Sequence, residues 1–107
     1  MEASFGPSQG AAVLDIGGDV GAAVVHTPAA LDGSEIEITP DGREWNGTHV
    51  AVRRRPTATL EPDAVFCAIF GHLPAGAYRI RVRDTPSQQL SWALTVVGGQ
   101  VTEVDLG

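Results

Sequence analysis

The chain has 107 residues, 43% of them hydrophobic, and a formal net charge of −6. This length and apolar content indicate one globular domain with an ordinary core and argue against disorder. The acidic balance disfavours nonspecific binding to nucleic acid. No apolar run approaches the roughly 20 residues that span a bilayer, and the start Met1-Glu2-Ala3 does not look like a secretory leader. We therefore expect a soluble, cytoplasmic protein without a membrane span.

Turn residues divide the chain into eight short segments with strand character. Between residues 34 and 39, Ile36 and Ile38 alternate with Glu35 and Glu37, so the isoleucines should face the core and the glutamates solvent. Gly17-Gly18-Asp19 predicts the turn of a first hairpin. The expected strands cover residues 11–16, 20–26, 34–39, 48–54, 64–70, 78–83, 90–96 and 101–106. This pattern predicts an all-β antiparallel β-sandwich of seven or eight strands over residues 11–107, preceded by a flexible arm over residues 1–10.

The stretch over residues 64–83 organises the rest of the chain. Residues 64–70 are apolar without interruption, which is typical of a strand buried on both faces. Cys67 lies within this run and is expected to be a small buried apolar residue, since a single cysteine cannot form an intramolecular disulfide. Three turn-forming residues then predict a tight corner rather than a continued strand, namely Gly71, Pro74 and Gly76. Beyond the corner, apolar residues alternate with arginines, as in a strand with one solvated face.

These residues carry a family resemblance. The sequence Phe-Gly-His-Leu-Pro-Ala-Gly-Ala-Tyr-Arg-Ile-Arg-Val over residues 70–82, followed by Leu-Thr-Val-Val-Gly-Gly-Gln-Val-Thr-Glu-Val-Asp-Leu over residues 94–106, resembles the second half of transthyretin-like and carboxypeptidase-regulatory-like β-sandwich domains. The resemblance implies an immunoglobulin-like sandwich that serves as a structural, adhesive or accessory module. The hydroxyisourate hydrolases, an enzyme branch similar to transthyretin, end in Tyr-Arg-Gly-Ser. This chain ends in Val-Asp-Leu-Gly, so that activity is not carried over.

Three histidines are candidate metal ligands. His26, His49 and His72 lie near expected strand ends, where loops gather. Three imidazoles can bind Zn²⁺ or Cu²⁺, as in a metal-binding protein or a metal-dependent hydrolase of phosphoesters or lipids. The alternative is three polar loop residues without a cofactor, since no short His-x-His spacing or cysteine partner accompanies them. The metal hypothesis requires that all three converge at one end of the sandwich.

Arginines form the other candidate site. Arg53 and Arg55 lie on one expected strand, and Arg79, Arg81 and Arg83 lie on another. If the two strands share a sheet, these side chains form a cationic stripe that suits carboxylates or phosphates. The alternative is cross-strand pairing with acidic neighbours, above all Glu35 and Glu37 and then Glu103 and Asp105. Trp45, beside Arg43 and Glu44 in a loop, is either an interface anchor or folded back over a sheet edge.

Together these patterns predict a non-catalytic binding or accessory module that takes an anion or a protein through an arginine-rich sheet face. A protein partner or a homodimer through an edge strand is expected, because open edges of a sandwich can pair with further strands. No Gly-x-Ser-x-Gly elbow or other catalytic pattern occurs in the sequence. The metal-dependent hydrolase that uses the three histidines is the alternative function.

Overall fold

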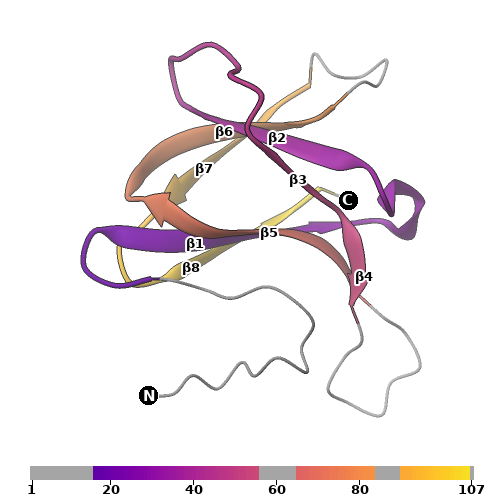
Figure 1. Ribbon diagram of the computed structural model, residues 1–107, viewed down its shortest axis with the longest axis horizontal. Coiled ribbons are helices and arrows are strands. Elements are labelled where there is room, and N and C mark those ends of the chain that lie inside the picture. The colour runs from indigo at the N-terminus through magenta and orange to yellow at the C-terminus, as the bar shows by residue number, and fades with distance from the viewer. Residues whose placement is uncertain (1–15, 56–64, 84–89, 107) are drawn as a thin grey trace.

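The computed structural model describes residues 16–55, 65–83 and 90–106. Within these ranges the chain forms two four-stranded sheets, the two layers in Figure 1. Sheet A has the strand order β4-β5-β1-β8, and sheet B has the order β3-β2-β6-β7. The strands are β1 (Val20–Thr27), β2 (Glu35–Pro40), β3 (His49–Ala51), β4 (Arg53–Arg55), β5 (Val65–Pro74), β6 (Gly76–Val82), β7 (Trp92–Val96) and β8 (Val101–Asp105). The expected all-β sandwich is confirmed.

The core lies between the two sheets. The alternation expected for β6 is confirmed, because Tyr78, Ile80 and Val82 are buried while the intervening arginines face away from sheet A. β5 is buried on both faces only at its centre, where Cys67 and Ala68 point to opposite faces and are 3% and 0% exposed, whereas Val65 at its start is 40% exposed. No helix in the described ranges has the length and hydropathy needed to cross a membrane.

One pair of neighbouring described strands departs from the expected antiparallel arrangement. β1 and β8 run parallel, with Ala22 beside Val101 and His26 beside Asp105. The other paired strands are antiparallel. A parallel neighbour cannot be joined by a short hairpin, and the chain indeed reaches β8 from β7 in the other sheet.

The first hairpin is described only at its turn. Gly17 and Val20 exchange two backbone hydrogen bonds of 2.9 Å around Gly18 and Asp19. Gly18 has a φ of 57°, as such a two-residue turn requires. The strand expected over residues 11–16 lies outside the described residues, except for Ile16, and so does the arm over residues 1–10. β1 itself has β5 on one edge and β8 on the other.

The strand expected over residues 48–54 is wrong, because it is broken in two at Val52. β3 pairs with β2 in sheet B, whereas β4 pairs with β5 in sheet A. Val52 bridges the change: its N–H donates to Ser34 O at 2.7 Å and its carbonyl accepts from Gly33 N at 2.9 Å. Its side chain is buried, at 1% exposure. The chain therefore crosses between the sheets at a single residue, where β3 descends into β4 in Figure 1.

β5 also runs further than expected, because Gly71 does not end it. The register between β1 and β5 shifts after Gly21, so that Gly71 and His72 together oppose Ala22. Such a bulge lets a strand continue past a residue that breaks the pairing. The corner is reduced to Ala75, after which β6 continues in the other sheet.

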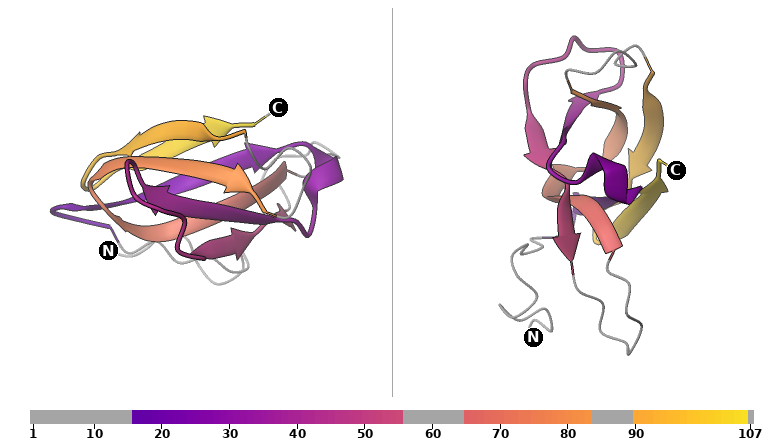
Figure 2. Two further views of the ribbon diagram at one scale, coloured as in Figure 1. Left: turned by 90° about the horizontal axis from the view of Figure 1, so that it is seen from above. Right: turned by 90° about the vertical axis from the view of Figure 1, so that its right-hand side faces the viewer.

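Turns gather at one end of the sandwich. Ala75 N donates to Asp19 O at 2.8 Å, and Gly99 N donates to Val20 O at 2.9 Å. Gly98 lies directly against Gly18, where a Cβ atom would collide with the Gly18 carbonyl oxygen. At the other end, the short 3₁₀ helix η2 (Ala29–Leu31) leads from β1 towards β2, and it is nearest the viewer on the right of Figure 2.

Candidate functional site

Arg79 and Arg81 of β6, and Arg83 directly after it, lie on the outer face of sheet B and pair with acidic side chains; we refer to all three as the arginines of β6. Arg81 Nε donates to Glu37 Oε1 at 2.6 Å, and Arg83 Nη1 donates to Glu35 Oε1 at 2.7 Å. The register explains the first contact, because Glu37 stands directly opposite Arg81 in the antiparallel pair. Arg79 Nη1 lies 4.0 Å from Asp41 Oδ1, and this side chain also hydrogen-bonds the Ser91 hydroxyl. The cross-strand pairing weighed in the sequence is therefore confirmed for Arg81 and Arg83.

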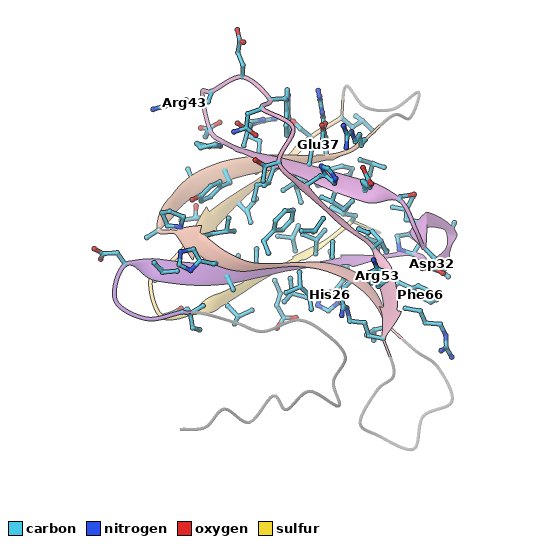
Figure 3. The ribbon with its side chains drawn as sticks, viewed as in Figure 1. His26, Asp32, Glu37, Arg43, Arg53 and Phe66 are labelled. Carbon is cyan, nitrogen blue, oxygen red and sulfur yellow. The ribbon has the colours of Figure 1, made fainter. Side chains whose placement is uncertain are left out.

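Glu37 was expected to face solvent, and this is wrong. It is only 5% exposed, because the loop between β2 and β3 folds back over this part of sheet B. Thr39 Oγ1 donates to Glu44 O at 2.9 Å, and the Arg81 guanidinium carbon lies 4.2 Å from the centre of the Trp45 ring. Figure 3 shows Glu37 and Arg43 on the same side of the molecule, beyond β2. Trp45 is thus half-buried over the ion pair between Arg81 and Glu37, as expected if it folds back over the sheet rather than serving as an interface anchor.

The arginines of β4 occupy a different surface. Arg53 stands beside Cys67 and Arg55 beside Val65, on the outer face of sheet A, while Arg54 stands beside Phe66 on the other face. No carboxylate among the described residues pairs with any of the three. The Arg55 Nε atom is buried and has no hydrogen-bond partner. We call Arg53, Arg54 and Arg55 the β4 arginines.

The expected cationic stripe does not form. Its condition was that the strand of Arg53 and Arg55 shares a sheet with the strand of Arg79, Arg81 and Arg83, and the crossing at Val52 places them in different sheets. Arg54 was not among the residues that the sequence suggested, because strict alternation assigned it to the core side. The sequence feature that could have drawn attention to Arg54 is the run of three consecutive arginines, because the alternation of a strand would place an apolar residue on the core side.

The three histidines do not converge. His49 lies on the edge strand of sheet B, where its Nε2 is 3.5 Å from Glu35 Oε1. His26 lies on the outer face of sheet A, where its Nε2 is 2.8 Å from Glu103 Oε1. His72 is on β5, five positions beyond the residue that pairs with His26, which corresponds to about 15 Å along the strand. Ligands of one ion cannot lie that far apart, and in the described ranges no three potential ligands gather around a common point.

Tyr78 stabilises the corner between β5 and β6. Its hydroxyl donates to Pro74 O at 2.6 Å, and burial raises the pKa of this hydroxyl above its ordinary value of 10.0. A buried phenol with a single carbonyl acceptor and no base beside it is suited to holding the corner rather than to proton transfer. Tyr78 is therefore a structural residue.

Comparison with known proteins adds no relative. No family model, curated protein or solved structure matches the chain. The resemblance to transthyretin-like and carboxypeptidase-regulatory-like domains stays a prediction. The assignment of function consequently depends on the charges and edges of the sandwich itself.

Proposed function

We propose that the chain is a non-catalytic binding module that takes an acidic segment of a protein partner at the β4 arginines. The observation that carries the proposal is the contrast between two sets of three arginines. Those of β6 face Glu35, Glu37 and Asp41, so their charges are largely compensated within the fold. Those of β4 have no carboxylate partner among the described residues. Positive potential is therefore concentrated on β4 of an otherwise acidic protein.

The position of β4 suits an extended partner. Among the described strands, β4 is an edge of sheet A with a neighbour on one side only. An edge strand can take a further strand through backbone hydrogen bonds, while its side chains select the partner. Arg53 and Arg55 lie one pleat apart on the same face, which matches acidic residues at alternate positions of an added strand.

A purely protective role is the competing explanation. Short edge strands rich in charge also prevent sheets from joining edge to edge. Under that explanation, neutralising the β4 arginines would promote aggregation without removing any binding. The resemblance to transthyretin-like domains is compatible with either role, because a fold of this kind serves many functions.

The test uses the full chain and a short fluorescent peptide with glutamates at alternate positions. Fluorescence anisotropy at low and high salt should show binding that weakens with salt, and no binding of the matching glutamine peptide. Arg53→Gln should weaken binding about tenfold at low salt, as loss of a charge-assisted contact predicts. Arg43→Gln is the matched control, because Arg43 is an exposed loop residue and the net charge changes equally.

Two results would contradict the proposal. Equal weakening by Arg53→Gln and Arg43→Gln would show diffuse attraction rather than a site. Competition by inorganic phosphate as effective as that by the peptide would indicate a small-anion site rather than a surface for an acidic protein segment. Light scattering on the same samples separates the protective role, which predicts aggregation of Arg53→Gln with no change in peptide binding.

A further inference from the structure

The two edges of sheet A carry opposite charge. One edge is β4, with its three consecutive arginines, and the other is β8, which carries Glu103 and Asp105. On the right of Figure 2, β4 and β8 lie at opposite borders of the lower layer. The outer strands of sheet B show no such polarity, since β3 contributes His49 and β7 has no ionisable residue. The polarity is therefore a property of sheet A.

The charged side chains of the two edges lie on the same face. Glu103 stands beside Val24 and Asp105 beside His26 on β1, and His26 in turn stands beside Cys67, the neighbour of Arg53. Arg53, Cys67, His26 and Asp105 thus form one row across the outer face of sheet A. Each edge presents two charges separated by one pleat, roughly 7 Å.

The direction of the strands also agrees. β4 is antiparallel to β5, β5 is antiparallel to β1, and β1 is parallel to β8, so β4 and β8 point the same way. A second copy placed beside the first in the same orientation would set its β8 parallel to β4 and continue sheet A. Glu103 and Asp105 would then face Arg53 and Arg55 as cross-strand pairs.

Of the strands that the structure describes, β1 alone pairs with β8, so the other side of the β8 backbone is the side for such a contact. Gln100 O accepts from Ala22 N, and Leu106 N donates to His26 O, so the even-numbered positions at both ends of β8 bond to β1. By the alternation of a strand, the N–H and C=O groups of the odd-numbered residues Val101, Glu103 and Asp105 point to the other side.

We propose that a second copy of this chain is a partner of the β4 arginines, which pair with its β8 so that sheet A continues from one molecule into the next. Two β4 edges repel each other through their arginines, and two β8 edges repel each other through their carboxylates. Only the unlike pair is attractive, so the contact is head-to-tail. After two molecules have paired, β8 of one and β4 of the other are still available. Further copies can therefore add, which builds open chains or rings rather than closed two-fold dimers. The inference rests on the proposed function of β4 and names the acidic strand that it takes.

The experiment compares charge-reversed forms of the full chain by sedimentation velocity at increasing protein concentration and low salt. The average mass of the unmodified chain should rise with concentration and fall when salt is added. Arg53→Glu removes the attraction at β4 and Glu103→Arg removes it at β8, so either variant alone should associate about tenfold or more weakly. Arg43→Glu and Glu44→Arg are the matched controls, because both are exposed loop residues, and they should associate like the unmodified chain.

Mixing the two variants gives the sharpest result. Glu103→Arg retains an intact β4 and Arg53→Glu retains an intact β8, so these two edges keep the original attraction in an equimolar mixture. The two substituted edges also carry opposite charges, with their signs exchanged, so the mixture should associate more strongly than either variant alone. A monomer at every concentration, association of either variant as strong as that of the unmodified chain, or a mixture that associates no more strongly than either variant alone would each overturn the inference.

The proposed function and this inference fail separately. Glu103→Arg leaves β4 intact, so it should bind the glutamate peptide as the unmodified chain does. Peptide binding without self-association would overturn the inference and leave the proposed function standing. Self-association that depends on Arg53 and Glu103, without peptide binding, would restrict the partner to another copy of the chain. Absence of both would overturn both.

Discussion

Tyr78→Phe is expected to lower the free energy of unfolding by about 1 kcal/mol, the net value of one hydrogen bond. The hydroxyl donates to Pro74 O at 2.6 Å across the corner between β5 and β6. The ring is 8% exposed and remains in the variant, so burial of apolar surface hardly changes. Because Pro74 is exposed, water can hydrate its carbonyl once the phenol is gone. In a domain of this size, the loss corresponds to a fall of about 4–8 °C in the midpoint of thermal unfolding.

The same hydroxyl makes stability depend on alkaline pH. Burial raises the pKa of Tyr78 above 10.0, so the folded state favours the neutral phenol more strongly than the unfolded state does. The resulting stabilisation is fully present below the unfolded pKa of about 10 and is lost as the pH rises through the folded pKa. The stability difference between the unmodified chain and Tyr78→Phe should therefore shrink above about pH 10. The chain has a single tyrosine, so tyrosinate absorbance reports this group alone.

Urea unfolding followed by circular dichroism, from neutral to alkaline pH, would measure both effects. Thr95→Val is the matched control, because Thr95 is exposed and no described residue hydrogen-bonds its hydroxyl; a change within about 0.5 kcal/mol is expected. The reasoning is refuted if Tyr78→Phe is as stable as Thr95→Val at neutral pH, or if the phenol of the folded protein titrates at its ordinary pKa.

Three further substitutions, and a control for the last of them, test the packing by urea unfolding. Glu37→Gln should cost about 2–4 kcal/mol, because it removes the charge partner of Arg81 beneath the folded-back loop; a cost below that of an exposed pair would contradict the burial of this ion pair. Trp45→Ala should cost about 1 kcal/mol through the lost contact with the guanidinium of Arg81, and should make the Glu37–Arg81 pair more sensitive to salt. Gly98→Ala should cost about 1–3 kcal/mol by collision with backbone, whereas Gly18→Asn, at an open position with a φ of 57° that asparagine tolerates, should be nearly neutral.

Local patterns predicted the parts of the fold that depend on neighbouring residues. The alternation of Tyr78, Ile80 and Val82 with arginines gives β6 its buried and solvated faces. The unbroken apolar run around Cys67 gives the centre of β5 two buried faces. In both cases the periodicity of the side chains is the direct consequence of which faces of the strand are covered.

Features that depend on distant contacts were missed. Val50 and Val52 have the spacing of one continuous strand, and only the hydrogen bonds of Val52 with Gly33 and Ser34 show that the chain changes sheet there. Gly71 has the character of a strand end, yet a bulge opposite β1 absorbs it. Periodicity contains no information about which strand will be the neighbour, and pairing with a particular neighbour decided each of these cases.

The crossing at Val52 also determines where the β4 arginines lie. Had residues 48–54 formed one strand beside β2, Arg53 would have shared sheet B with the arginines of β6 and with Glu35 and Glu37. In the structure those two carboxylates face Arg81, Arg83 and His49, and the β4 arginines stand at an edge of sheet A, across the sheet from Glu103 and Asp105. A change of sheet at one buried valine thus replaces a compensated surface by a sheet with one basic and one acidic border. Because the two borders of sheet A carry opposite charge, association through edge strands is the property to test first.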